Sequence, residues 1–204
     1  MAQEEKWGEV TWRSQNLKDF QRYSFNDVGN FFRWEWQELY HDAGLKRLEI
    51  EVIRKIMRGE PVVHAMGGDC CRGNATRMQR VDSDGGSSTK VASTDLIVPD
   101  WVALSLCVEP TSRALGNGPF YFVGKEAMYR TASAWPLQAT ENSVESLDAL
   151  YGLDSGCLDM MPGDILVRNP LVWHCGTINV TGKSTYLPGL VWKVHRGMFL
   201  QSMD

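Results

Sequence analysis

Apolar residues recur at helical spacing in one stretch of the first third of the chain. In residues 43–58, leucine, isoleucine and valine fall three or four positions apart, with lysine, arginine and glutamate on the opposite side and Gly59 directly after. This pattern predicts an amphipathic helix. The preceding residues are polar and aromatic, and we expect a short helix beginning after Asn26 or Asp27.

From residue 60 onward the pattern changes to short apolar stretches separated by Gly, Pro, Asn and Asp, which predicts β-strands. The predicted strands are PVVHAM (61–66), ATRMQRV (75–81), WVALSLCV (101–108), PFYFVG (119–124), DILVRN (164–169), LVWHCGTI (171–178) and YLPGLVWKVH (186–195). Residues 141–151 carry apolar side chains at three-residue steps and predict a helical insertion. Strands without alternating helices indicate an antiparallel sandwich or barrel.

Length and charge narrow the class of protein. A chain of 204 residues suits a single domain, and a net charge of −4 with scattered lysine and arginine offers no basic stripe for nucleic acid or for a membrane surface. No apolar run reaches the roughly 18 residues of a membrane span, and residues 1–12 lack the apolar segment of a signal peptide, so we expect a cytoplasmic protein. Five cysteines without a C-x-x-C motif indicate neither a disulfide framework nor a structural zinc site.

Two carboxylates, Asp82 and Asp84, stand one residue apart in RMQRVDSDGGSS. On a strand they project to the same face, where like charges repel. Water, a basic residue or a metal cation must offset this repulsion. Arg72, Arg77 and Arg80 are close in sequence, so a salt bridge is the alternative to a metal, and a solvated turn also fits the pattern.

His174 follows a Pro-Gly-Asp turn and a predicted strand. A histidine in this position is either a hydrogen-bonded structural residue or a ligand. Trp173 beside it and Trp101 on an earlier strand suit the wall of a pocket for an apolar organic molecule. His64, which enters a glycine turn, is either a further lining residue of this pocket or a structural residue.

The segment MPGDILVRNPLVWHCGTINVTGKSTYLPGLVWKVH (161–195) resembles the distal strands of phytanoyl-CoA dioxygenase-like proteins, a branch of the iron(II)/2-oxoglutarate oxygenases. In that family a P-G-D turn precedes the distal iron-binding histidine, here His174, and an asparagine follows five residues later, here Asn179. WVALSLCVEPTSRALGNGPFYFVGKEAMYR (101–130) resembles the middle segment of the family, except that V-G-K-E at Val123 to Glu126 replaces a PGSH-like stretch. The resemblance covers roughly residues 60 to 196.

This resemblance implies a mainly β fold, the double-stranded β-helix (jelly-roll or cupin-like), with N-terminal helices packed on its outside. Residues 1–59 would form a helical segment, and residues 60–204 the β-helix core of the same domain. The family's first metal motif, H-x-D, falls on QRVDSDGG, so Asp84 matches the iron-binding aspartate and Asp82 stands where the family has histidine. Asp82, Asp84 and His174 are therefore the candidate metal ligands and catalytic residues. The extra carboxylate favours Mg²⁺, Mn²⁺ or Ca²⁺ over Fe²⁺.

The resemblance also implies an arginine eleven residues after His174 that binds the distal carboxylate of 2-oxoglutarate. Thr185 stands there instead, so we expect the affinity for 2-oxoglutarate to fall by a factor on the order of ten to a thousand. Lys183 is a candidate replacement, as are Lys193 and Arg196.

Three functions remain open. The first is oxidative tailoring of a small apolar molecule, of the secondary-metabolite type, with Fe(II) and 2-oxoglutarate. The second is a redox-neutral cyclisation, isomerisation or dehydration in the same pocket, with another divalent metal or none, in which Asp82 or Asp84 acts as general acid or base and His174 as its partner. The third is a catalytically impaired subunit that forms a homo- or hetero-dimer with a related oxygenase. All three lack a nucleic-acid or membrane partner.

Overall fold

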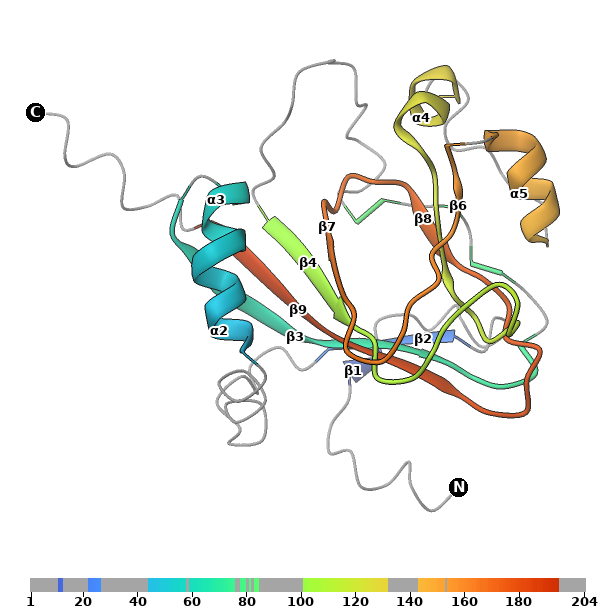
Figure 1. Ribbon diagram of the computed structural model, residues 1–204, viewed down its shortest axis with the longest axis horizontal. Helices are drawn as coiled ribbons and strands as arrows, with labels where there is room; N and C mark the ends of the chain where they lie inside the picture. The colour runs from blue at the N-terminus through green and yellow to red at the C-terminus, as the bar shows by residue number, and fades with distance from the viewer. Residues whose placement is uncertain are drawn as a thin grey trace, which may run out of the picture.

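The computed structural model describes residues 11–12, 22–26, 44–57, 59–75, 78–79, 81, 83–84, 101–131, 143–152 and 154–194. They form two antiparallel β-sheets with helices on the outer faces (Figure 1). The predicted mainly β, double-stranded β-helix architecture is confirmed. No helix in this described part of the chain is long and apolar enough to cross a membrane.

The larger sheet has the strand order β1-β2-β3-β9-β4-β7. Its strands are β1 (Thr11–Trp12), β2 (Arg22–Asn26), β3 (Pro61–Cys71), β9 (Thr185–Val194), β4 (Trp101–Leu106) and β7 (Ile165–Arg168). The long strand β9 is central, because it pairs with β3 on one side and β4 on the other.

Strands β1 and β2 correct the expectation that residues 1–59 form only a helical segment. The whole of β2 pairs antiparallel with β3, from Arg22 opposite Cys71 to Asn26 opposite Gly67. In β2 (RYSFN), Tyr23 and Phe25 alternate with polar residues as in a strand, but a run of five residues is a weak signal by itself. The two strands form because the edge of β3 offers unpaired backbone donors and acceptors, which is a tertiary effect. The short helix expected after Asn26 or Asp27 lies outside the described residues.

The smaller sheet has the order β6-β5-β8, with β6 (Gly156–Cys157), β5 (Phe120–Phe122) and β8 (His174–Gly176). Two described residues of the 75–84 stretch, Gln79 and Asp84, are bonded to the chain at β8 and just before it. The backbone N–H of Gln79 donates to the carbonyl of Gly176 at 3.0 Å, and that of Asp84 donates to Pro170 at 2.9 Å. The strand predicted at 75–81 is thus, in its described residues, not a regular strand, and the bond to Pro170 places Asp84 near the end of β8 that begins with His174.

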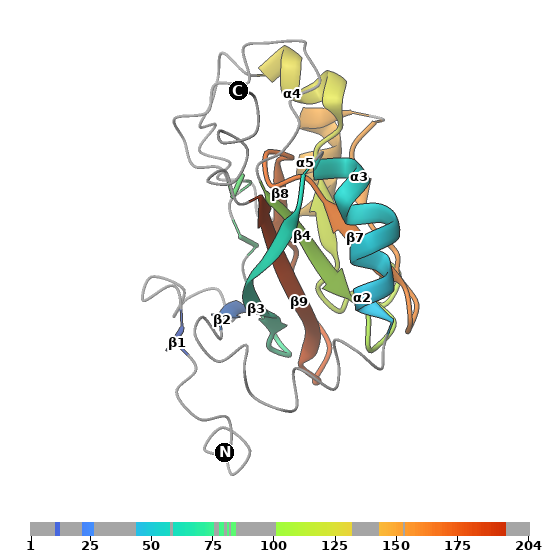
Figure 2. The same cartoon turned by 90° about the vertical axis from the view of Figure 1, so that its left-hand side faces the viewer.

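The predicted helix at 43–58 is confirmed as three continuous pieces: α2 (Leu45–Leu48), the π-helical η3 (Glu49–Ile53) and α3 (Arg54–Met57). It lies on the outer face of the larger sheet (Figure 2). The core between helix and sheet consists of Leu45, Ile53, Met57, Val102, Leu104, Leu190 and Trp192. Because strand residues alternate, Ala103 and Ser105 of β4 point the opposite way, towards the smaller sheet.

A buried carboxylate connects this helix to the sheet. Glu49 is 2% exposed, accepts a hydrogen bond from Nε1 of Trp192 at 2.8 Å, and pairs with Nζ of Lys46 at 2.6 Å. The π-helical turn places Glu49 directly over the fully buried indole of Trp192. The contact joins the N-terminal part of the chain to the central strand β9.

We expect Glu49→Leu to lower the free energy of unfolding by about 1–3 kcal/mol, because the buried indole N–H of Trp192 loses its acceptor. Glu49→Gln is the matched control, since its amide oxygen can still accept this bond, and it should lose about 1 kcal/mol or less. Urea denaturation followed by tryptophan fluorescence measures both. Equal losses for the two variants would contradict the assigned role of the hydrogen bond.

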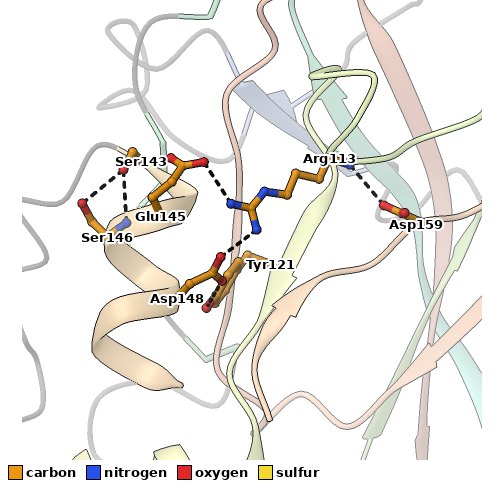
Figure 3. A network of polar contacts seen from close by, with 7 residues as sticks. All are labelled: Arg113, Tyr121, Ser143, Glu145, Ser146, Asp148 and Asp159. Carbon is orange, nitrogen blue, oxygen red and sulfur yellow. Dashed lines mark hydrogen bonds and ion pairs between the residues drawn. The ribbon is translucent and has the colours of Figure 1, made fainter. Parts of the chain in front are cut away.

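The helical insertion predicted at 141–151 is confirmed as α5 (Val144–Tyr151), and polar contacts hold it on the outer face of the smaller sheet. Arg113 donates to Glu145 at 2.9 Å and to Asp148 at 2.6 Å, and the Tyr121 hydroxyl donates to Asp148 at 3.1 Å (Figure 3). Burial and the nearby Asp148 raise the pKa of Tyr121 above its usual value, so the hydroxyl remains a donor. This face of β5 therefore serves to hold α5 in place.

The departure V-G-K-E from the family pattern builds the start of α4 (Lys125–Thr131). The carboxylate of Asp154 accepts from the backbone N–H of Glu126 at 2.9 Å and of Ala127 at 3.4 Å. A Cβ at Gly124 would lie 2.1 Å from the carbonyl oxygen of Asp154, so only glycine allows this close approach.

Candidate functional site

Two of the predicted site residues, Asp84 and His174, meet on the inner side of the smaller sheet. Oδ2 of Asp84 lies 3.9 Å from Nε2 of His174. Strand β8 carries His174 as its first residue, and the backbone bond to Pro170 fixes Asp84 beside it. The fold thus joins two groups that are far apart in the sequence.

The imidazole of His174 is held in one orientation. Its Nδ1 lies 2.9 Å from the carbonyl oxygen of Val172, and because a carbonyl only accepts, Nδ1 carries the proton and Nε2 keeps its lone pair. The ring stacks on Phe122 with centroids 6.0 Å apart and meets Phe120 edge-on at 6.1 Å. Burial lowers the pKa of His174, the positive charge of Arg168 adds to this, and Asp84 opposes it. The imidazole is therefore suited to act, in its neutral form, as a metal ligand or proton acceptor.

An arginine, Arg168, forms an ion pair with the carboxylate of Asp84. Nη1 of Arg168, the last residue of β7, donates to Oδ2 of Asp84. Arg168 lies directly opposite Ala103 in the β4–β7 pair, so both side chains point to the inner face. The Arg168 side chain is only 14% exposed, and its Nε is buried with no acceptor among the described residues.

Sequence proximity suggested Arg72, Arg77 and Arg80 as salt-bridge partners of the paired acids. Arg72 is exposed just after β3, and Arg77 and Arg80 lie outside the described residues. Arg168 was missed because it is 84 residues from Asp84. The available signal was a charged residue at the end of the otherwise apolar strand DILVRN, in phase with the inward positions.

The two tryptophans predicted for the pocket, Trp101 and Trp173, do not lie on the same face of the fold. Trp101 begins β4 and, by alternation, shares the inner face with Ala103, at the end of the sheet where Arg168 lies. Trp173 is next to His174 in sequence and so points to the opposite face of β8, where it is buried with Tyr121. The structure does not bring Trp173 to the side that carries His174. Asp82 lies outside the described residues, and its place beside Asp84 stays a prediction.

The remaining candidates are His64, Lys183 and Thr185. His64 is exposed at an irregularity in the register of β3 with β9. Lys183 is exposed in the bend before β9, whereas spacing had suggested the strand itself. Thr185 is 3% exposed, and its hydroxyl donates to the carbonyl of Asn117 at 2.9 Å.

Thr185 also contacts Asn179. Its Oγ1 lies 3.5 Å from Nδ2 of Asn179, which is five residues beyond His174 in the chain. The hydroxyl is therefore part of a hydrogen-bond network with Asn117 and Asn179, beyond the end of β8.

The donor set suits a divalent metal in part. A carboxylate oxygen of Asp84 and the unprotonated Nε2 of His174 are donors that first-row divalent metals accept. Within the described ranges no group of three or more His, Cys, Asp or Glu side chains is arranged to hold a metal, and Asp82, the third ligand that the resemblance implies, lies outside these ranges. A metal between Asp84 and His174 would also have to displace the guanidinium of Arg168.

No protein-family model matches the sequence, and a search of curated proteins finds no match. Solved structures do match. HygX from Streptomyces hygroscopicus, with nickel and 2-oxoglutarate bound, has a TM-score of 0.61 and 10% identity over 96% of this chain and 78% of its own. EctD from S. alaskensis in its apoform has a TM-score of 0.56 and 17% identity over 84% of this chain and 56% of its own. AviO1 from Streptomyces viridochromogenes Tue57 has a TM-score of 0.52 and 15% identity over 85% of this chain and 66% of its own.

This chain thus spans little more than half the length of EctD. EctD has also been solved with 2-oxoglutarate and 5-hydroxyectoine, and with bound Fe. At identities of 10% to 17%, these likenesses concern the fold. The chain shares the double-stranded β-helix with HygX, EctD and AviO1, and within that fold Asp84, His174 and Arg168 lie together on the inner side.

Proposed function

We propose that this chain is an enzyme of the iron(II)/2-oxoglutarate oxygenase class that oxidises a small apolar organic molecule. The observation that carries the proposal is the meeting of Asp84 with His174, whose Nε2 keeps its lone pair. The resemblance of residues 161–195 to phytanoyl-CoA dioxygenase-like proteins supports it, as does the fold shared with HygX and EctD.

In this proposal Asp84, His174 and Asp82 hold the metal, and a bound iron(II) ion supplies the activation of dioxygen. Phe120 and Phe122 keep the imidazole in its ligating orientation and exclude water from it. Trp101 offers an aromatic surface for the apolar substrate on the same inner face.

The replacement of the family's arginine by Thr185 predicts weak binding of 2-oxoglutarate. The Thr185 hydroxyl already donates to Asn117, and a neutral hydroxyl replaces a two-pronged charged group. We expect an affinity lower than that of an arginine-containing site by a factor on the order of ten to a thousand.

Anaerobic calorimetry with Fe²⁺, followed by 2-oxoglutarate, tests the proposal on the purified chain. We expect iron to bind, 2-oxoglutarate to bind weakly to the iron-loaded protein, and succinate to form when air is admitted. Chelator-treated protein is the control and should release no succinate. Absence of iron binding, of 2-oxoglutarate binding and of succinate would reject the oxygenase function.

The Arg168–Asp84 ion pair favours a second candidate, a redox-neutral cyclase, isomerase or dehydratase. A guanidinium that compensates Asp84 allows the site to exist without a metal, and a neutral His174 can then accept a proton from a bound substrate. Turnover that is insensitive to chelators and to removal of oxygen would support this function. Strict metal dependence would contradict it.

A further inference from the structure

We propose that Arg168 and a divalent metal ion compete for the carboxylate of Asp84, so that Arg168 closes the metal site until the metal displaces it. This inference rests on the proposed function only in assigning the metal to Asp84 and His174. It adds an internal cation that sets the metal affinity of the site, a role that no motif of the sequence indicated.

The competition arises because Arg168 and the metal would bind the same oxygen atom of Asp84. Oδ2 of Asp84 accepts from Nη1 of Arg168 and is also the oxygen 3.9 Å from Nε2 of His174. A metal held by both side chains would need this oxygen and this nitrogen as its ligands. The guanidinium bound to the same oxygen holds its positive charge beside this oxygen.

The positive charge of Arg168 also opposes metal binding. Because Nη1 of Arg168 is bonded to the carboxylate oxygen that lies nearest Nε2 of His174, its positive charge disfavours a divalent cation at Nε2. Both charges of the ion pair are partly removed from water, with 14% of the Arg168 side chain and 34% of the Asp84 side chain exposed. Metal binding must therefore break a charge-assisted hydrogen bond that water screens only partly.

The closed pair is nevertheless incomplete, which allows displacement. Nε of Arg168 is buried, and no acceptor for it lies within the described part of the chain. A buried donor without a partner is costly, and native structures rarely keep one without a reason. A guanidinium that leaves Asp84 and turns towards water satisfies this donor, which offsets part of the cost of breaking the ion pair.

Titration of the full chain with Mn²⁺, with free Mn²⁺ counted by electron paramagnetic resonance, measures the competition. Arg168→Gln removes the charge but keeps the length and polarity, and we expect it to bind Mn²⁺ about 10- to 100-fold more tightly than the native chain. Arg168→Lys keeps the charge and should bind as the native chain does. Arg113→Gln, which removes an ion-paired arginine beside α5, is the matched control and should also leave the affinity unchanged. Circular dichroism verifies that each variant is folded.

A second measurement uses the native chain. The Nε–H signal of Arg168 in a nitrogen-edited NMR spectrum, identified by its absence in Arg168→Lys, should shift as Zn²⁺ is added, because competition for Asp84 is reciprocal. The inference is overturned if Zn²⁺ binds without moving this signal, if folded Arg168→Gln binds Mn²⁺ no more tightly than the native chain, or if neither chain binds Mn²⁺. These readouts do not depend on turnover, so the succinate assay can fail while the competition is observed, or the reverse.

Discussion

Replacing His174 by alanine is expected to weaken divalent metal binding more than 100-fold and to abolish metal-dependent turnover. Loss even of a residue that only orients a metal ligand costs 10- to 100-fold, so loss of the ligand itself costs more. The carbonyl of Val172 and the rings of Phe120 and Phe122 fix the imidazole, so its removal takes away a pre-oriented ligand. Mn²⁺ titration and succinate release measure the two effects.

The matched control for this experiment is Glu109→Gln, which changes an exposed carboxylate after β4 and should leave metal binding intact. Asp84→Asn should reproduce the loss seen in His174→Ala, because it removes the carboxylate charge from the same site. Metal binding by His174→Ala at native affinity would mean that the imidazole is not a ligand. A loss of chelator-insensitive turnover in the same variant would instead favour the redox-neutral function.

Restoring the family's arginine by Thr185→Arg is expected to destabilise the protein by about 3–5 kcal/mol and to leave 2-oxoglutarate binding weak. Thr185 is 3% exposed, so a larger side chain overpacks its surroundings. The carbonyl of Asn117 loses its donor, and a charged group is placed at a buried position. Thermal and urea denaturation measure the stability, and calorimetry measures 2-oxoglutarate binding.

Two smaller substitutions separate the causes of this loss. Thr185→Ser keeps the hydroxyl and should cost about 1 kcal/mol or less, whereas Thr185→Val keeps the shape, removes the donor and should cost about 1–2 kcal/mol. If Thr185→Arg were as stable as the native chain and bound 2-oxoglutarate tightly, the hydroxyl network would have no structural role. Such a result would also restore the site that the resemblance implies.

The local pattern of apolar and polar residues was sufficient to predict most of the helices and strands. The amphipathic helix at 43–58 and the strands that became β3, β4, β5, β7, β8 and β9 each carry their own periodicity or apolar run, bounded by turn residues. This pattern did not correctly predict two segments whose backbone hydrogen bonds are made with strands distant in the sequence. Strand β2 is paired along the edge of β3, and the described residues among 75–81 lie beside β8 outside any regular strand, although their apolar character suggested one.

The sequence by itself predicted the class of fold and proposed Asp84 and His174 for the candidate site, because strand periodicity is local and the motif around His174 is compact. Only the tertiary structure decided that Asp84 meets His174, that Trp173 points away from them, and that Arg168 is the cation between the sheets. The physical reason is that the face of a strand residue and its partner on another strand depend on register and sheet packing. A charge 84 residues away can therefore bind the carboxylate that a nearby arginine was expected to hold.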